Sequence, residues 1–321
     1  MSHSVLNVVV ARKRSEAVDI TSFELASEDG QPLPSFAAGS HIDVYLPGGM
    51  VRQYSLCNDP REKHRYLIAV LRDASGRGGS KAIHDLVHEG DRLQISTPRN
   101  HFPLAHHAPH HILLAGGIGV TPILCMAERL AATAEPFDMH YCTRSTERTA
   151  FAGCIGEAEF SRSVHFHHDD NACGSTFDLS GTLDSAPAGA HLYVCGPRGF
   201  MDAVLAAARN KGWSEDRLHY EFFGAVIGQT ATDKSFRVRV ASSGATVEVG
   251  AACTVVQALA AHGIEVMTSC EQGVCGTCLT GVLDGEPDHR DSYLTPEERS
   301  ANDQFLPCCS RSKSAMLVLD L

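Results

Sequence analysis

The first third of the chain carries short runs in which apolar and polar residues alternate, separated by turn-forming residues. Such runs predict β-strands, and Pro-Gly-Gly at 47–49 predicts a hairpin between two of them. A short helix is expected at Lys81–Val87, stopped by Gly90. The predicted strands are Ile20–Leu25, Ser40–Leu46, Val51–Leu56, Tyr66–Leu71 and Arg92–Ser96. Closure into an antiparallel β-barrel over residues 1–108 would leave none of these short strands with an open edge.

The pattern changes over residues 109–226, where apolar strand-like runs alternate with helical ones. The predicted strands are Ile112–Ala115, Asp138–Cys142, Val164–His168 and Leu192–Cys195, and the predicted helices are Ile123–Ala132 and Phe200–Asn210. Thr121 suits the N-cap of the first helix and Pro122 its first position, while Gly212 suits the end of the second. Alternation of this kind predicts an α/β domain with a parallel sheet.

A polar stretch at 227–235 is expected to be a linker, and residues 236–321 to form a third, smaller domain. Phe236–Val240 and Thr246–Val249 alternate as a hairpin around Ser243-Gly244. Thr254 is expected to cap a helix over Val255–Ala261 that ends at Gly263, and Ala315–Leu321 to be a final strand. Two strands, a helix, a loop and a last strand predict a mixed domain of β-grasp type.

Composition and charge narrow the class of protein. The 321 residues are 43% hydrophobic and 20% charged, which is typical of a globular protein with two or three domains. The net charge of −11 argues against a nucleic-acid partner. No apolar run approaches the ~20 residues of a membrane span, and the N-terminus lacks the pattern of a secretory leader. The twelve cysteines are irregularly spaced, which favours a reducing cytoplasm over a disulfide scaffold.

The strongest chemical signal is a cysteine motif, Cys270-x4-Cys275-x2-Cys278, with a further cysteine, Cys308, later in the chain. This spacing is that of plant-type [2Fe–2S] ligands. Gly273 and Gly276 suit a loop that must bring its backbone close to inorganic sulfide. A structural zinc site would more usually show two short C-x2-C knuckles. Cys309 stands beside Cys308, and spacing alone does not choose the fourth ligand between them.

Two weaker clusters lie in the first domain. Arg52, Tyr54 and Ser55 share a strand and could hold a phosphate and a flat ring. Gly76-Arg-Gly-Gly-Ser80 precedes a helix and could bind an anion at the helix N-terminus, although most such loops are only turns. The two clusters support each other because both belong to one predicted barrel.

The second domain has two turns at strand ends, where open α/β sheets bind ligands. Gly116–Pro122 is not G-x-G-x-x-G, and its glycines serve either a pyrophosphate or close packing. Cys195-Gly196-Pro197 follows the fourth strand. Thr143-Arg144-Ser145 follows the second and suits an adenosine ribose, where Arg144 could meet a 2′-phosphate or stack on adenine.

Histidines gather in two places. Five of them lie between His101 and His111, a stretch that Pro103 and Pro109 interrupt and that is expected to be a linker. His165 and His167 alternate on a strand beside Asp169 and Asp170, which leaves a metal site open, but a strand end at the domain surface is the better interpretation.

Six motifs occur in a specific order: Arg52-x-Tyr54-Ser55, Gly76-Arg-Gly-Gly-Ser80, Gly116-Gly-Ile-Gly-Val-Thr-Pro122, Cys195-Gly-Pro197, Glu221-x-Phe223-Gly224 and the cysteine set. With this order the whole chain resembles the phthalate dioxygenase reductase family, which includes vanillate demethylase reductases. The resemblance implies an FMN domain, an NAD domain and a ferredoxin domain in succession, with NADH as the preferred nucleotide. It also selects Cys308 as the fourth cluster ligand; Cys309 departs from the Val that relatives often carry.

The resemblance implies a residue set for each cofactor. No general acid or base is needed for hydride transfer, so no catalytic triad is assigned. Cys195, Glu221 and Phe223 are expected near the nicotinamide. The expected FMN contacts are Arg52, Gln53, Tyr54, Ser55, Ala69, Val70, Leu71, Gly78, Gly79, Ser80, Thr121 and Phe223. The expected NAD contacts are Gly116, Gly117, Gly119, Thr143, Arg144, Ser145, Cys195, Gly196 and Pro197.

The function that the resemblance implies is an electron-transfer enzyme. NADH would reduce FMN, and electrons would pass through the [2Fe–2S] cluster to a Rieske-type oxygenase that hydroxylates or demethylates an aromatic acid. The chain is expected to act as a monomer. A reductase of a cytochrome P450 is the alternative within the same class. A zinc- or cluster-stabilised binding or sensor module is the alternative from another class.

Overall fold

The computed structural model describes residues 5–47, 49–74, 78–105, 107–170, 177–223, 233–251, 253–268, 273, 276–291 and 293–321. The chain separates into two compact units, Met1–Glu221 and Phe222–Leu321. Cys270, Cys275 and Gly76, which the sequence singles out, lie outside the described residues, as does most of the expected linker.

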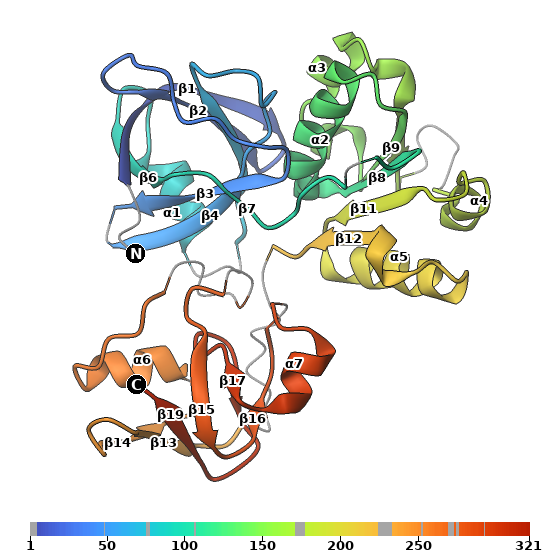
Figure 1. Cartoon of the computed structure of the whole chain (residues 1–321). Coiled ribbons are helices and arrows are strands. Elements are labelled where there is room, and N and C mark those ends of the chain that lie inside the picture. Colours follow the sequence, from blue (N-terminus) through green and yellow to red (C-terminus); the bar gives the residue numbers. More distant parts are fainter. Residues whose placement is uncertain are drawn as a thin grey trace. The chain divides into compact units, whose positions relative to one another are not determined.

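The first unit begins with an antiparallel sheet (Figure 1). Its strand order is β4-β3-β6-β1-β2-β5, and β7 pairs with β3. A bridge between Leu56, just after β4, and Ile68 in β5 joins the two ends of this order. The strands are β1 (Val5–Ala17), β2 (Ile20–Ser27), β3 (Ser40–Leu46), β4 (Met50–Ser55), β5 (Tyr66–Leu71), β6 (Arg92–Ser96) and β7 (Arg99–Asn100). All five strands that the alternating pattern predicts in this region are present.

Strand β1 was not predicted, although it is the longest in the sheet. Its second half, Arg12–Ala17, is charged and largely exposed, so the apolar alternation is confined to Val8 and Val10 at its centre. These two side chains are fully buried and pack with Phe23, Leu25 and Ile42 inside the sheet. Helix α1 (Gly79–Leu86) packs on the same core through Ala82 and Ile83.

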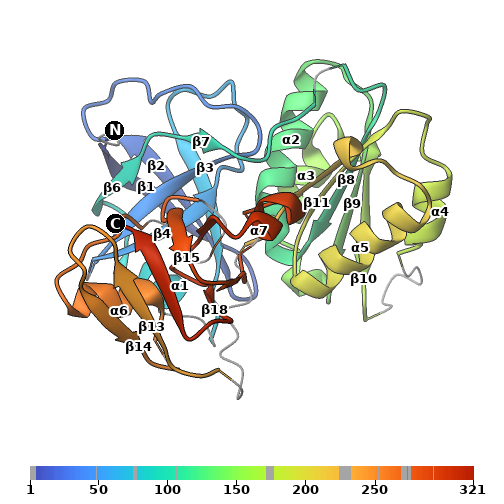
Figure 2. The same ribbon diagram turned by 60° about the horizontal axis from the view of Figure 1, so that its bottom comes forward.

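The first unit continues with a five-stranded sheet whose strands are all parallel. Its order is β10-β9-β8-β11-β12. Helices α2 and α3 lie on one face of it and α5 on the other (Figure 2). The strands are β8 (His111–Gly116), β9 (Phe137–Thr143), β10 (Val164–His168), β11 (His191–Cys195) and β12 (Leu218–Glu221); the helices are α2 (Val120–Ala132), α3 (Ala152–Glu157), α4 (Leu179–Asp184) and α5 (Arg198–Asn210). The parallel sheet predicted from alternation is therefore present, with β12 added at its edge.

The start of α2 differs from the prediction. Thr121 is not the N-cap: a 3-10 turn, η1 (Gly117–Gly119), leads directly into the helix, and Gly119 occupies the cap position. The Thr121 hydroxyl instead donates to the Ile118 carbonyl at 3.2 Å. Pro122 consequently occupies the third helical position, where its missing N–H is still one of those that lack an intrahelical acceptor.

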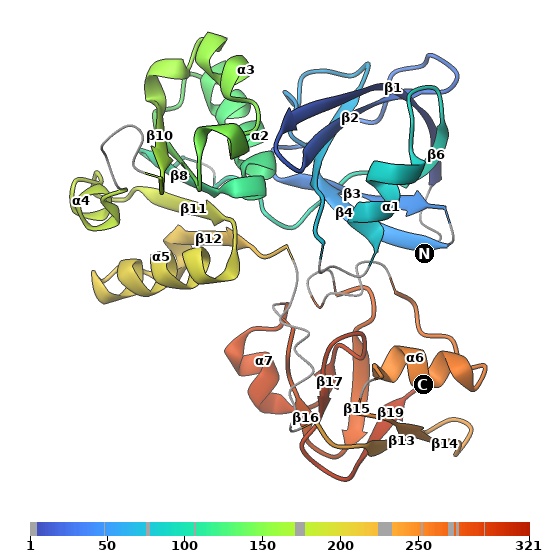
Figure 3. The ribbon, with the colours of Figure 1, turned by 180° about the vertical axis from the view of Figure 1, so that it is seen from behind.

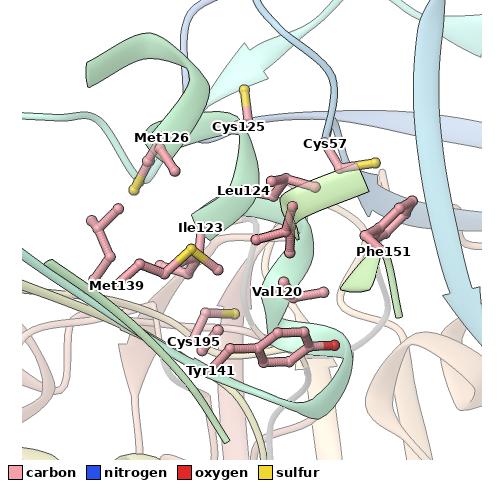
Figure 4. Packing of buried hydrophobic residues seen from close by; sticks show 14 of the residues in the cluster. Cys57, Val120, Ile123, Leu124, Cys125, Met126, Met139, Tyr141, Phe151 and Cys195 are labelled. Carbon is pink, nitrogen blue, oxygen red and sulfur yellow. The ribbon is translucent and has the colours of Figure 1, made fainter. Parts of the chain in front are cut away.

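One hydrophobic cluster spans both sheets of the first unit (Figure 4). It joins residues of α2, such as Ile123 and Met126, to Cys57 and Ala69 of the antiparallel part and to Cys195 of β11. The two sheets therefore share a core and form one compact unit, which fixes the ends of β4 and β5 relative to the parallel sheet.

The second unit contains a mixed sheet of order β14-β13-β19-β15-β17 (Figure 3). Among its described strands, β13 and β19 pair in parallel and the other neighbours are antiparallel. Its strands are β13 (Phe236–Val240), β14 (Thr246–Val249), β15 (Thr280–Asp284), β17 (Gln304–Phe305) and β19 (Met316–Asp320), and a separate ribbon joins β16 (Pro287–Asp288) to β18 (Arg311–Ser312). Helix α6 (Val255–Ala261) packs on the sheet core through Val255 and Leu259.

Helix α6 and a second helix of this unit each begin with a capping box. Thr254 and Gln257 form the one in α6, which confirms the predicted cap. Thr295 and Glu298 form the other in α7 (Pro296–Ala301), a helix that was not predicted although Thr-Pro-x-Glu is a recognisable start signal. In the described part of the chain, every helix is too short or too polar to cross a membrane.

Candidate functional site

The carboxyl edge of the parallel sheet collects four of the predicted nucleotide-site residues. Gly116, Thr143, Cys195 and Glu221 are the last residues of β8, β9, β11 and β12. The register pairs Ala115 with Cys195, and Cys195 with Glu221, so these strands end nearly level. This is the edge at which open α/β sheets bind ligands.

Three of the turn glycines allow two backbone segments to touch. A Cβ on Gly119 would overlap the Cys195 carbonyl, and one on Gly196 would press on Gly116 Cα. Close packing of the two turns therefore accounts for these glycines. Gly117 differs, because it has φ +52° and because, among the described residues, nothing beyond its chain neighbours lies within 4 Å of where its Cβ would be. Open space at this residue leaves room for a ligand against the backbone.

The end of β9 is held by hydrogen bonds within the protein. The Thr143 hydroxyl is buried and lies 2.8 Å from Thr149 Oγ1 and 2.9 Å from His168 Nδ1. The hydroxyl thus holds the strand end in shape. Arg144 is exposed at this position, where its guanidinium can reach solvent.

On the antiparallel side, Arg52 meets the glycine loop before α1. Arg52, Gln53, Tyr54 and Ser55 lie on β4, with Arg52 and Ser55 buried. A Cβ on Gly79 would overlap the Arg52 side chain from Cγ to Nε, so the guanidinium stem lies directly over the first residue of α1. Gly78, the N-cap, has φ +86°. An Arg side chain against a helix N-terminus is a suitable phosphate cradle, so these residues fit a flavin mononucleotide.

The strand that carries Ala69, Val70 and Leu71 contacts the turn before α2. These residues end β5, which touches η1, and Ala69 belongs to the cluster shared with α2. Thr121, in the first turn of α2, is buried nearby. Strand β5, which carries three residues assigned to FMN, thus lies against the turn assigned to the nucleotide. Ser80 Oγ accepts a hydrogen bond from the Asp73 N–H at 3.1 Å, which holds the loop end.

Ser55 and Glu221 join the two halves of this site. The Ser55 hydroxyl donates to Glu221 Oε2 at 3.2 Å. Burial raises the pKa of Glu221 to about 7, partly offset by this hydrogen bond. The carboxyl is therefore able to exchange a proton near neutral pH.

Cys195 lies beside Glu221 and is fully buried. Burial, and then the neighbouring carboxylate, raise the pKa of the Cys195 thiol well above its ordinary value. A neutral thiol is a poor nucleophile, so its chemistry here is packing and weak polar contact. Phe223 is 41% exposed and belongs to the second unit.

In the second unit, two of the four expected cluster cysteines are described. Cys278 and Cys308 are both buried, their thiols are within hydrogen-bonding reach of each other, and Leu294 and Leu306 pack around them. Gly273 and Gly276 have φ +69° and +71°, as expected for a loop wrapped closely around a cluster. Two buried thiols that converge beside such a loop fit a soft iron–sulfur centre.

One residue that sequence reasoning did not assign supports this loop. The Asp291 carboxylate is fully buried and accepts hydrogen bonds from the N–H groups of Tyr293 and Leu294 at 3.1 and 2.8 Å. The Tyr293 ring lies on Gly276, where a Cβ would overlap it. Asp291 therefore fixes the segment that covers the loop. Its signal in the sequence is an Asp two residues before an aromatic residue, which is too common to be read alone.

The histidines hold no metal set in the part of the chain that the structure describes: no group of three or more His, Cys, Asp or Glu side chains there could bind an ion. His140 and His167 instead pair through Nδ1 and Nε2 at 3.0 Å. A cavity of about 770 Å³ opens elsewhere in the first unit, with Phe36, Leu104 and Arg129 among its lining residues. The predicted flavin and nucleotide residues do not line it.

Comparison with known proteins defines the class. Residues 238–313 match the 2Fe-2S iron-sulfur cluster binding domain, and residues 93–218 match the dimethylamine monooxygenase subunit DmmA-like N-terminal domain. The chain is 51% identical to a vanillate O-demethylase oxidoreductase of Pseudomonas sp. (strain HR199 / DSM 7063), over 99% of this chain and 100% of that one. These similarities define an oxidoreductase of an oxygenase system that carries an iron–sulfur domain.

Several solved structures are similar over 99% of this chain, and two of them bear on its class. One is phthalate dioxygenase reductase, described as a modular structure for electron transfer from pyridine nucleotides to [2Fe–2S], with 41% identity, a TM-score of 0.82 and 98% of that chain covered. The other is an intact type IV self-sufficient cytochrome P450 monooxygenase, with 38% identity, a TM-score of 0.79 and 41% of that chain covered. The chain belongs to the phthalate dioxygenase reductase family, as the order of its motifs predicts.

Proposed function

We propose that the protein is an NADH-dependent reductase that passes electrons through FMN and a [2Fe–2S] cluster to a Rieske-type aromatic oxygenase or O-demethylase. The observation that carries this proposal is the hydrogen bond from Ser55 to Glu221. It joins the end of the strand assigned to the flavin to the edge assigned to the nucleotide. A hydride donor and a flavin bound at these two places would lie next to each other.

The proposal assigns domains and sites as the sequence predicts them. Residues 1–108 form an FMN-binding β-barrel of ferredoxin-reductase type, 109–226 an NAD-binding α/β domain, 227–235 a linker and 236–321 a β-grasp ferredoxin domain. The ligands of the cluster are Cys270, Cys275, Cys278 and Cys308. When bound, FMN accepts a hydride and supplies single electrons to the cluster.

The residues of this chain position the cofactors. Arg52 and the N–H groups that begin α1 hold the FMN phosphate, since both present positive potential at one point. Tyr54 and Val70 bound the flavin ring. Gly117 gives the nucleotide access to backbone N–H groups. Ser55 and Glu221 exclude water between the two ligands and hold the nicotinamide by hydrogen bonds.

A visible spectrum of the purified, anaerobic protein, titrated with NADH and separately with NADPH, tests the proposal. We expect flavin and iron–sulfur bands that NADH bleaches at far lower concentration than NADPH. Bands that neither nucleotide bleaches, or one bound zinc and no iron, would contradict it. The zinc result would favour the binding or sensor module.

The similarity to a P450 monooxygenase structure supports a second candidate, a reductase of a cytochrome P450. The 51% identity to a vanillate O-demethylase oxidoreductase favours the Rieske partner. Cytochrome c reduction does not separate the two. NADH-driven turnover with a purified Rieske oxygenase and with a purified P450, at matched protein concentrations, does.

A further inference from the structure

The thiol of Cys309 lies against the loop that carries the cluster cysteines. Cys309 is 4% exposed. Its sulfur occupies the space into which a side chain on Gly273 would project, so Cys309 Sγ contacts the loop backbone between Cys270 and Cys275. A cluster held by the proposed ligands would therefore have the Cys309 sulfur close by.

Cys308 has a thiol neighbour on each side. Its sulfur is within hydrogen-bonding reach of Cys278 and also of Cys309. The contact with Cys278 fits two ligands that share one cluster. The contact with Cys309 places an S–H group beside the sulfur of a ligand.

The turn that contains both residues keeps their roles apart. The N–H groups of Cys309 and Ser310 both donate to the Leu306 carbonyl, at 3.2 and 2.9 Å. Successive side chains leave such a tight turn in different directions. The Cys308 sulfur is within hydrogen-bonding reach of Cys278, whereas the Cys309 sulfur lies against Gly273.

The other partners of the Cys309 thiol are two neutral oxygen atoms. Its sulfur lies 3.7 Å from the Leu306 carbonyl oxygen and 3.7 Å from Ser310 Oγ. When Cys308 is bound to iron as a thiolate, it is a better acceptor for the Cys309 S–H than either of these neutral oxygens.

We propose that Cys309 is not a ligand of the cluster but donates an S–H···S hydrogen bond to the Cys308 sulfur and thereby raises the reduction potential of the cluster. The reduced cluster carries one more negative charge, so a donor to a ligand sulfur stabilises the reduced form more than the oxidised form. Cys309 is thus a positioning residue. This inference rests on the proposed ligation by Cys308.

Redox titration of the full-length holoprotein, followed by the electron paramagnetic resonance of the reduced cluster, tests the proposal. In Cys309→Ala the potential should fall, so that at one fixed ambient potential the reduced-to-oxidised ratio drops on the order of fivefold, as for the loss of one weak hydrogen bond. Cys309→Ser keeps a donor and should retain or raise the wild-type ratio. Iron content, flavin content and the rate of flavin reduction by NADH should be unchanged in both variants.

Cys253→Ala is the matched control, since it removes another thiol of the second unit whose sulfur contacts its own chain at Thr254 O, 3.4 Å away. It should not move the potential. An unchanged potential in Cys309→Ala would overturn the proposal. A second result would also overturn it: Cys309→Ala and Cys309→Ser lose iron, while Cys308→Ala keeps its cluster. Cys309 would then be the cluster ligand. A wild-type protein without an iron–sulfur spectrum would instead contradict the proposed function itself.

Discussion

Ser55 donates a hydrogen bond to Glu221 across the first unit, although 166 residues separate them in the chain. The serine ends a strand of the antiparallel sheet, and the glutamate ends the edge strand of the parallel sheet. Their contact depends on the core that the two sheets share. This single hydrogen bond therefore reports how the ends of the two sheets are aligned.

Ser55→Ala should shift the pH dependence of flavin reduction upward. The hydrogen bond from Ser55 holds the pKa of Glu221 down, against the larger effect of burial, which raises it to about 7. Without the hydroxyl the carboxyl stays protonated to higher pH, and alignment weakens. We expect the rate of flavin reduction by NADH to fall roughly three- to tenfold, with its inflection above that of wild type, in anaerobic stopped-flow measurements. Ser55→Thr, which keeps a hydroxyl, is the control; an unshifted inflection in Ser55→Ala would mean that Glu221 does not govern the profile.

Glu221→Gln should remove a pH-dependent loss of stability. The folded-state pKa of Glu221 is raised above the ordinary value of 4.5, so the folded state binds the proton more tightly than the unfolded state. Its contribution to stability is therefore largest below about pH 4.5 and declines until about pH 7. The variant lacks this decline and should be more stable than wild type at pH 8, by about 1 kcal/mol. Thermal unfolding measures this gain as the difference in Tm between variant and wild type at pH 5 and at pH 8. Equal Tm differences at the two pH values would contradict the prediction.

Much of this arrangement follows from local sequence. Alternating apolar and polar residues predict strands β2 to β6. Alternating strands and helices predict the parallel sheet, and Thr254 predicts the cap of α6. Strand β1 was not predicted because its charged half lies outside the core. Strand β12 was not predicted because its four residues are too few to show a pattern. Thr121 looks like an N-cap, but the 3-10 turn at Gly117–Gly119 moves the helix start, which only tertiary packing against Cys195 decides.

The sequence predicts less of the candidate site than of the fold. Single motifs place Ser55 and Glu221 each beside a cofactor, but no local pattern reports that two strand ends from different sheets meet. The contact of Gly79 with Arg52 is of the same kind. The roles of the turn glycines were open between ligand binding and packing, and the structure separates Gly119 and Gly196, which pack, from Gly117, which faces open space.

Paired histidines should make the first unit sensitive to acid. Burial and neighbouring imidazoles lower the pKa of His219 to about 4, and His191 Nδ1 lies 2.8 Å from His219 Nε2. Asp216 opposes this shift, while His111 adds to it. Because the folded-state pKa is depressed, stability is complete above about pH 6.5 and is lost as the pH falls toward 4. In calorimetry between pH 7 and pH 5, the Tm of His219→Asn should fall less than that of wild type. The control His88→Asn changes an exposed histidine and should match wild type. The same dependence of Tm on pH in all three proteins would refute the role given to His219.

Gly79→Ala should weaken FMN retention. A Cβ at this position overlaps the Arg52 side chain, so the guanidinium must move away from the N-terminus of α1, where the phosphate is proposed to bind. Loss of one charge-assisted contact corresponds to about 1.5–3 kcal/mol, or a rise in the FMN dissociation constant of at least tenfold. Gly199→Ala is the matched control, because it adds the same methyl group to helix α5 at a point where no side chain or backbone of the described residues, apart from the helix itself, lies within 4 Å. It should be neutral or stabilising. Titration of the apoprotein with FMN, followed by flavin fluorescence, gives both constants. A wild-type constant in Gly79→Ala would remove Arg52 from the proposed phosphate site, whereas equal weakening in both variants would indicate a general loss of stability.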